Sequence, residues 1–204
     1  MSLVFDEATH QYFLNGEKIP SVTQLVAPLG DDVDDALELT VEAAAERGSM
    51  MHAYIAHRLS GEAEEDFELP EAYSGYAEAV ELFLSEHTIA PLLIEQPLST
   101  SVYSYYKFAG TPDFVGEYDD VLSILDYKFV SAVCKSKVGA QLNGYDALCE
   151  DNGIFIEALY AIQFLSNGTY RVYPVERDET PFKFTLYLNR YKEKKHPRGR
   201  IGGM

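Results

Sequence analysis

Residues 3–20 alternate apolar and polar side chains, as strands with one buried face do. Asn15-Gly16 interrupts the alternation, and this dipeptide favours the two-residue turn of a β-hairpin. The segment therefore predicts a small hairpin or meander. Ser21 follows it and is a suitable N-cap for a short helix with the sequence SVTQLVAPL.

Four later segments have the spacing of apolar residues that is typical of helices. Residues 35–59 are rich in Ala, Glu and Leu, and residues 70–87 begin with a proline, which suits the first turn of a helix. Residues 136–150 precede Asn152-Gly153, a pair that favours the end of a helix. Residues 181–195 predict the last helix.

Between the second and third of these helices, β-branched and aromatic residues dominate. The segments PLLIEQPLS, VYSYYKFAG, PDFVGEY and VLSILDYKFV each predict a strand, and Asp119-Asp120 is expected to turn the last two into an antiparallel pair. Residues 155–176 predict a further hairpin around Asn167-Gly168.

This order of elements indicates a mixed central sheet flanked by helices, an α/β or α+β fold. The length of 204 residues suits one domain with a sizeable core. We divide that domain into an N-terminal hairpin and short helix (1–34), a helical region (35–90), the core sheet with its helix (91–180), and a C-terminal helix with a basic tail (181–204).

Charge is distributed unevenly along the chain, whose net charge is −17. The first 99 residues carry 3 basic and 20 acidic side chains, and the remaining residues carry 13 of each. Residues 190–200 hold six basic residues and one acid, a tail that either contacts phosphates or solubilises a helix end. The acidic half is expected to form a solvated surface. The alternatives are that it repels nucleic acid from that side of the protein or that it contacts a basic partner.

The composition excludes several classes of protein. Cys134 and Cys149 are too few for a disulfide framework and indicate free thiols in a reducing cytoplasm. No apolar run approaches the ~20 residues of a membrane span, and the first ten residues lack the pattern of a secretory signal. We therefore expect a cytoplasmic protein that does not contact a membrane.

The most informative stretch is GTPDFVGEYDDVLSILDYK, from Gly110 to Lys128. Asp113 and Asp126 lie at similar distances from the predicted turn, so they are expected side by side on adjacent strands, about 5 Å apart. Two carboxylates so close on an apolar sheet repel each other and lose solvation, unless a cation lies between them. Mg²⁺ suits this position because it prefers oxygen ligands and often binds through one or two carboxylates plus substrate phosphate.

Lys128 lies two residues after Asp126 and therefore on the same face of the strand. Its ammonium group would orient or help deprotonate an attacking water and would neutralise charge on a phosphate. Two acids, a metal ion and a lysine predict a centre that hydrolyses phosphodiester bonds. The alternative is an ordinary surface Asp–Lys pair with an Asp in a turn.

This pattern resembles the PD-(D/E)XK nuclease superfamily, in the branch of RecB-like, Cas4-like and phage-type exonucleases. Pro112-Asp113 matches the first signature, and Asp126-Tyr127-Lys128 matches the second. The branch also has a Gln-x-x-x-Tyr motif on the next helix, which Gln141 and Tyr145 match. The resemblance implies a restriction-endonuclease-like core and an Mg²⁺- or Mn²⁺-dependent deoxyribonuclease, in which Gln141 and Tyr145 lie on one helix face over the metal and position the DNA.

The resemblance implies further metal ligands. A helical histidine is expected well upstream, after a glycine, and His52 after Gly48 fits, with His57 as a competitor. An acid is expected on the preceding strand, where Glu95 is found, and its alternative is a charge at a strand edge. The main-chain carbonyl of Tyr127 would complete the set.

The resemblance also implies partners: DNA ends or single strands, and a recombinase or single-strand-binding protein in phage-type recombination or repair. The four cysteines of an iron–sulfur cluster are absent, and no Walker-type loop indicates an ATP motor. Tyr103, Tyr105 and Tyr106 are candidates for stacking on unpaired bases. Two alternatives stay open, a non-catalytic member of the fold that binds DNA or a recombination partner, and a DNA-mimicking or structural protein.

Overall fold

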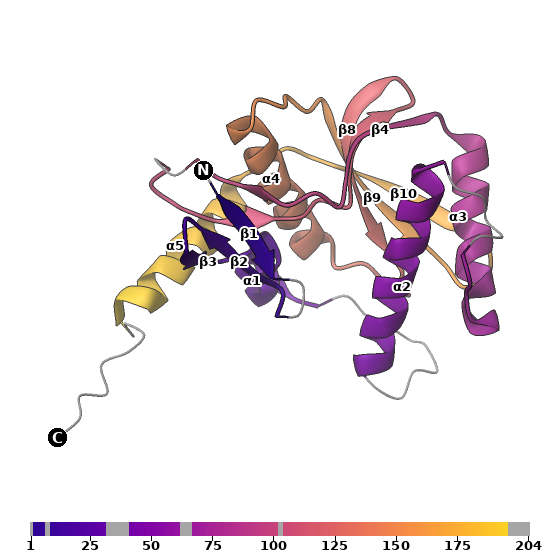
Figure 1. Cartoon of the computed structure of the whole chain (residues 1–204), viewed down its shortest axis with the longest axis horizontal. Helices are drawn as coiled ribbons and strands as arrows, with labels where there is room; N and C mark the ends of the chain where they lie inside the picture. Colours follow the sequence, from indigo (N-terminus) through magenta and orange to yellow (C-terminus); the bar gives the residue numbers. More distant parts are fainter. Residues whose placement is uncertain (1, 7–8, 32–40, 62–66, 102–103, 196–204) are drawn as a thin grey trace.

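A five-stranded mixed sheet lies at the centre of the computed structural model (Figure 1). The structure describes residues 2–6, 9–31, 41–61, 67–101 and 104–195. The strands of the sheet are β4 (Ile89–Ile94), β7 (Phe114–Tyr118), β8 (Val121–Lys128), β9 (Ala158–Phe164) and β10 (Tyr170–Val175). They follow the order β10-β9-β8-β7-β4 across the sheet. The predicted α/β fold with a mixed central sheet is confirmed.

Turn residues determine most of the strand pairing. Asp119 and Asp120 have φ angles of 50° and 66° and join β7 to β8 as an antiparallel pair. Gly168, with a φ of 78°, lies in the turn between β9 and β10, which are also antiparallel. Strands β8 and β9 are parallel, and the intervening chain contains a long helix, α4 (Lys135–Asp151). A parallel pair needs such a crossover because its strands run in the same direction.

The helices cover both faces of the sheet (Figure 1). Besides α4 they are α1 (Val22–Val26), α2 (Val41–Leu59), α3 (Ser74–Glu86) and α5 (Thr180–Lys195), with short 3-10 turns at Ala27–Leu29 and Glu71–Tyr73. Val115 and Ile124 pack with α1, α4 and α5 on one face. Their neighbours on the same strands, Phe114 and Leu125, pack with α2 and α3 on the other. Alternate positions of the same strands therefore serve two separate cores.

The N-terminal segment forms a small antiparallel sheet of its own, of β1 (Leu3–Asp6), β2 (Gln11–Leu14) and β3 (Glu17–Ile19). Asn15 and Gly16 have φ angles of 51° and 82°, as the predicted hairpin turn requires. Ser21 caps α1 through a capping box with Gln24. The predicted meander and capped helix are confirmed.

The predicted strand VYSYYKFAG is wrong over most of its length. In its described part only Ala109–Gly110 are strand, as β6, which pairs with β5 (Leu98–Ser99). Tyr106 instead packs against Tyr187 of α5, with ring centroids 5.5 Å apart, and Lys107 forms an ion pair with Glu17. Tyr106 of this segment therefore packs against a distant helix and does not pair with another strand.

Some expectations concern residues that the structure does not describe. The predicted helix over 35–59 is seen as α2 from residue 41 onward, and the predicted helix over 70–87 is seen as a 3-10 turn followed by α3. Residues 35–40, Tyr103 and the part of the basic tail from residue 196 lie outside the described ranges. Within those ranges, no helix combines the length and apolar character needed to cross a bilayer.

Candidate functional site

The two acids of the stretch from Gly110 to Lys128 meet where β7 begins and β8 ends. Asp113 directly precedes β7, and Asp126 lies near the end of β8. Phe114 pairs with Leu125 in the ladder, so the next positions outward, Asp113 and Asp126, face each other across the strands. A carboxylate oxygen of Asp113 accepts a hydrogen bond of 2.7 Å from the main-chain N–H of Tyr127. The predicted juxtaposition is present.

Asp126 is almost completely buried, at 1% exposure, and each of its oxygens lies near a polar group, although Oδ2 accepts no hydrogen bond of good geometry. Its Oδ2 lies 2.7 Å from Nζ of Lys128, so the two residues share a face of the strand as predicted. Its Oδ1 accepts a hydrogen bond of 3.0 Å from the Gln141 amide, which also donates to the Tyr145 hydroxyl at 3.1 Å. Gln141 and Tyr145 are one turn apart on α4, so this helix lies over the acids.

His52 and Glu95 approach Asp113 from two other elements. His52 is on α2, and its Nδ1 lies 3.4 Å from Asp113 Oδ1 and 3.7 Å from Glu95 Oε1. Glu95 follows β4 directly and has a left-handed φ of 46°, a conformation that is uncommon for residues other than glycine. Its N–H donates to the Asp113 carbonyl at 3.1 Å. His57, the competing histidine, packs against Phe67 instead and does not line this cavity.

These side chains line one open cavity of about 540 Å³. From the predicted set, the lining contains His52, Glu95, Asp113, Asp126, Lys128, Gln141 and Tyr145. The tyrosines Tyr105 and Tyr106, expected nearby, do not line it and pack around Arg190 of α5. Tyr127 is not among the lining residues, but its N–H donates to Asp113, and its carbonyl points to the same side of the strand as that N–H.

The sequence did not reveal the remaining lining residues, which come from the N-terminal segment and its vicinity. They are Phe5, His10, Tyr12, Ser21, Thr23, Gln24 and Thr111. Tyr12 and Thr111 share a hydrogen bond of 2.7 Å between their hydroxyl groups. Thr111 could have been expected in the cavity, because it lies two residues before Asp113. The sequence gives no comparable indication for the other six.

Burial and charge set the protonation of the cavity. Burial, with a contribution from Asp113, raises the pKa of Asp126 to about 6, although Lys128 and His52 oppose this. Burial also acts to raise the pKa of Asp113, but His52, Lys128 and the Tyr127 N–H outweigh it, so that pKa is lowered. For His52, burial acts to lower the pKa, and the Asp113 carboxylate more than compensates, so the pKa is raised. The Lys128 ammonium, and the His52 imidazole when it is protonated, offset the negative charge of the acids.

The donor atoms suit a hard divalent cation. Carboxylate oxygens of Asp113, Asp126 and Glu95, with the Tyr127 carbonyl, are the kind of ligand that Mg²⁺ and Mn²⁺ prefer, and His52 adds one nitrogen. In the described part of the chain, no three His, Cys, Asp or Glu side chains form a group that could hold one ion as they stand. The donor chemistry thus fits a divalent ion, and its binding requires side chains to shift, Asp126 away from Lys128 among them.

No family model matches the chain, and no curated protein sequence matches it significantly. Among solved structures, it is similar to an alkaline exonuclease from Laribacter hongkongensis, with 15% identity and a TM-score of 0.41 over 88% of this chain and 92% of that one. It is also similar to a protein provisionally described as an exonuclease from Eubacterium rectale, with 12% identity and a TM-score of 0.48 over 80% and 71% of the two chains.

Proposed function

We propose that this protein is a metal-dependent DNA nuclease that hydrolyses phosphodiester bonds, acting as an exonuclease in phage-type recombination or repair in the cytoplasm. The observation that carries this proposal is the convergence of Asp113, Asp126 and Lys128 with His52 and Glu95 in one cavity. These residues come from elements far apart in the chain, and an ordinary surface ion pair would not gather them. The proposal treats residues 1–204 as one nuclease domain of the PD-(D/E)XK type.

Each residue has a role in this proposal. Asp113, Asp126, Glu95, His52 and the Tyr127 carbonyl would hold Mg²⁺ or Mn²⁺. When bound, the ion would supply Lewis-acid activation of water and neutralise charge on the phosphate. His52 would bind the ion through a neutral imidazole nitrogen, so binding would release any proton that this nitrogen carries.

The other three residues act beside the metal ligands. Lys128 places a positive charge beside Asp126, where it would orient the attacking water and stabilise charge that develops on the phosphate. Gln141 holds the orientation of Asp126 through its hydrogen bond and is itself joined to Tyr145. Gln141 and Tyr145 would thereby position both the metal ligand and the DNA strand.

The direct test incubates the purified protein with end-labelled linear DNA, single- and double-stranded, and with closed circular DNA as a matched substrate. We expect linear DNA to be degraded to short products in Mg²⁺ or Mn²⁺ and to stay intact with EDTA. An exonuclease leaves the closed circle intact. Linear DNA that survives every metal tried, or is cleaved equally by Lys128→Ala, rejects the proposal.

Two substitutions separate metal binding from catalysis. We expect Mn²⁺ to raise the melting temperature of the wild-type protein by binding its folded state. Asp126→Asn removes a proposed ligand, so it should lose both cleavage and this rise. Lys128→Met should lose cleavage by about 100-fold or more but keep the Mn²⁺-dependent rise, because its ammonium group is not a ligand. Glu117→Gln, at an exposed acid on β7, is the control and should change neither. Loss of the Mn²⁺ effect in Lys128→Met would contradict the role given to Lys128.

A second candidate function is a non-catalytic protein of this fold that binds DNA or a recombination partner. The observation that favours it is that both oxygens of Asp126 already contact protein groups, Oδ2 the Lys128 ammonium and Oδ1 the Gln141 amide. Such a pair can be purely structural. Calorimetry with Mn²⁺ and with DNA distinguishes the two functions, since binding without turnover supports this second one.

A further inference from the structure

We propose that the N-terminal meander, β1 to β3, binds the nucleobase next to the scissile phosphate by stacking it on Phe5, and that the preferred substrate is therefore an unpaired DNA end. This inference rests on the proposed nuclease function and specifies the substrate of the same cavity. It concerns the wall of the cavity formed by Phe5, His10 and Tyr12 of the N-terminal segment. None of the sequence motifs includes these residues.

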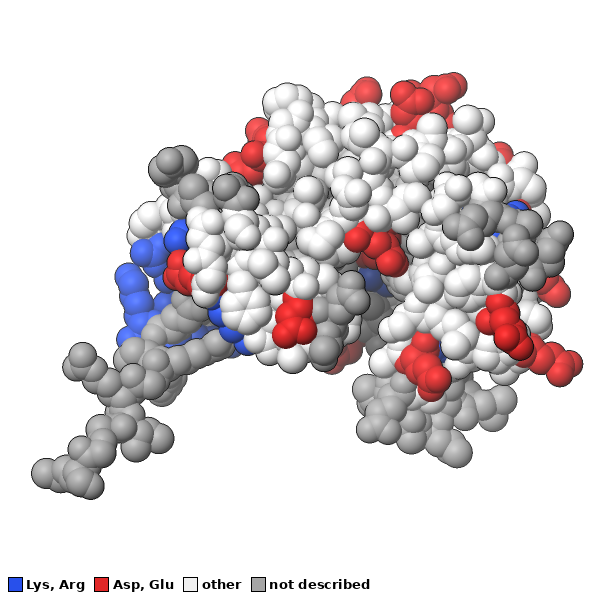
Figure 2. Space-filling view, in the orientation of Figure 1, with Lys and Arg blue, Asp and Glu red and all other residues white. Residues whose placement is uncertain are grey.

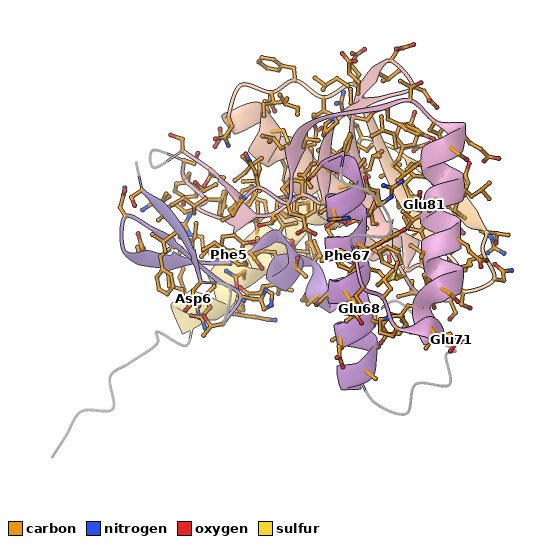
Figure 3. The ribbon with its side chains drawn as sticks, turned by 45° about the vertical axis from the view of Figure 1, so that its right-hand side comes forward. Phe5, Asp6, Phe67, Glu68, Glu71 and Glu81 are labelled. Atoms are coloured by element: carbon orange, nitrogen blue, oxygen red, sulfur yellow. The ribbon has the colours of Figure 1, made fainter. Side chains whose placement is uncertain are left out.

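An aromatic cluster of the meander lines the same cavity as the acids and Lys128. The Phe5 ring is stacked on the Tyr12 ring, with centroids 4.6 Å apart and planes inclined by 25°. His10 lies beside it, with its ring centroid 5.9 Å from that of Phe5. Figure 3 shows Phe5 on the meander, across from α2.

The degree of burial singles out Phe5 within this cluster. Tyr12 and Tyr145, the other large aromatic side chains of the lining, are 6% and 3% exposed and are held by hydrogen bonds to Thr111 and Gln141. Phe5 is half-buried and His10 is exposed. Phe5 therefore combines a supported ring with surface that is still open to a ligand.

The meander is fixed relative to the acids, as a positioning surface must be. The Tyr12 hydroxyl is bonded to that of Thr111, which lies two residues before Asp113. At the other end of the meander, the N–H of Ala109 donates to the Pro20 carbonyl at 3.0 Å, and Ser21 forms a parallel bridge with Ala109. These contacts join the aromatic wall to the segment that leads into Asp113.

The chemistry of a nucleotide matches the two sides of this cavity. A phosphate beside Lys128 places the attached sugar and base within reach of the neighbouring wall, and an aromatic ring is a sequence-tolerant partner for any base. A base inside a duplex has both faces covered by its neighbours in the stack. The terminal base of a blunt end has one face free, but it stays paired to the complementary strand and cannot enter the cavity without that strand unless the pair opens. The cavity therefore favours an unpaired nucleotide over a blunt duplex end.

The test combines substitutions in the protein with abasic sites in the DNA. Phe5→Ala, Phe5→Trp and wild type are assayed on single-stranded oligonucleotides with a normal terminus or with one abasic site at each of the first four positions. We expect Phe5→Ala to lower kcat/KM on the normal strand about 5- to 100-fold, the range that stacking of one base gives. Phe5→Trp should keep the wild-type rate. On the strand whose abasic site removes the stacked base, Phe5→Ala should have no further effect.

Val4→Ala is the matched control, because Val4 directly precedes Phe5 on the same strand, points to its other face and is 53% exposed. It should match wild type on every substrate. An equal loss for Phe5→Ala on normal and abasic strands would show a purely structural role and overturn the inference. So would a wild-type rate on blunt duplex that exceeds the rate on the single strand.

A binding measurement separates this inference from the proposed function. Oligonucleotides with 2-aminopurine in place of the terminal bases report stacking by fluorescence quenching, without any cleavage. We expect wild-type protein to quench the probe and Phe5→Ala not to quench it. If wild-type protein cleaves no DNA but still quenches through Phe5, only the nuclease function fails; if it cleaves DNA and the quenching is the same without Phe5, only the stacking site fails.

Discussion

Asp126 shows how much one buried side chain determines in this protein. It is 1% exposed, its two oxygens contact Lys128 and Gln141, and it faces Asp113 across the strand pair. Removing one partner of a buried pair leaves the other charge uncompensated, which is costly in free energy. A substitution of Asp126 is therefore expected to lower stability as well as activity. The melting temperature of Asp126→Asn without Mn²⁺ measures the loss of stability separately.

The two cysteines should differ sharply in reactivity. Cys149 is buried in the core between α4 and the sheet, and burial raises its thiol pKa to about 12, whereas Cys134 is half-buried at the start of α4. Since the thiolate is the reactive form, a disulfide reagent at pH 8 should titrate one thiol in the folded protein and two after denaturation. Cys134→Ser should abolish the fast reaction and Cys149→Ser should leave it unchanged. Two fast thiols in the folded protein would contradict this prediction.

At the scale of elements, α4 is the helix on which the site depends most. It carries Gln141 and Tyr145 and contacts α1, α5 and the strands β8 and β9. Between those two residues lies Gly144, where an added Cβ would come within 2.7 Å of the Phe182 ring and 2.9 Å of Val22. The glycine therefore allows α4 to approach both neighbouring helices closely enough to hold Gln141 against Asp126.

Two glycines on α4 give a matched pair of substitutions. Gly144→Ala should destabilise the protein by about 1–3 kcal/mol, because Phe182 and Val22 must move to make room. Gly139→Ala, on the same helix with nothing within 4 Å of an added Cβ, should stabilise it by about 0.5–1 kcal/mol through its better helix propensity. Urea denaturation measures both. Equal effects at the two positions would mean that the close helix contact does not control stability.

The elements that could be predicted from sequence have a local cause. Asn15-Gly16, Asp119-Asp120 and Asn167-Gly168 form turns through their own backbone preferences, and Ser21 caps α1 through a residue three positions away. The failed strand around Tyr106 has strong β propensity, but its neighbours in space, Tyr187 among them, decide its conformation. Local preference is visible in a sequence, whereas a contact with a distant helix is not.

The same distinction applies to the candidate site. Asp113, Asp126 and Lys128 could be placed together because a short turn fixes their register, and His52 and Glu95 followed from a family resemblance. The structure brings all five into one cavity, while their metal-binding and catalytic roles stay predictions. Phe5 and Tyr12 gave no signal, because their place in the cavity depends on how the meander docks through Ser21 and Ala109.

At the scale of the whole molecule, the two sides of the central sheet differ in charge and in the helices that cover them. Figure 2 shows lysine and arginine gathered at the side where α5 lies, while acidic residues are spread over the rest of the visible face. The layer of α2 and α3 on the opposite face of the sheet includes an ion pair between its two helices. Glu81 accepts hydrogen bonds from Arg58 at 2.6 and 2.8 Å and from the Tyr54 hydroxyl at 2.8 Å (Glu81 is labelled in Figure 3).

This ion pair should make stability depend on pH. Burial acts to raise the pKa of Glu81, but the bonds from Arg58 and Tyr54 outweigh it, so the pKa is lowered from 4.5. A carboxyl with a lowered pKa stabilises the folded state above its unfolded pKa, and this contribution is lost as the pH falls through the lowered value. Glu81→Gln should therefore cost about 1 kcal/mol at pH 7, an amount that allows for solvent screening.

Urea denaturation at pH 7, 5 and 3 checks the prediction for Glu81. The difference between wild type and Glu81→Gln should be the same at pH 7 and 5 and should shrink at pH 3. Glu117→Gln, at an exposed acid on β7, serves as the control. A difference that stays constant down to pH 3 would show that the Glu81 charge does not stabilise the contact between α2 and α3.

The tight turn at Asp119-Asp120 also has a consequence for how the chain reaches this structure. Hairpins form within about 1–10 μs because little chain entropy is lost in closing them, so β7 and β8 are expected to pair early. Asp113 and Asp126 would then approach each other before the distant helices deliver His52 and Gln141. The early hairpin would thus bring two acids together with only Lys128 to offset them. Neutralising Asp113 should therefore speed refolding, measured by stopped-flow fluorescence, even though it removes a proposed metal ligand.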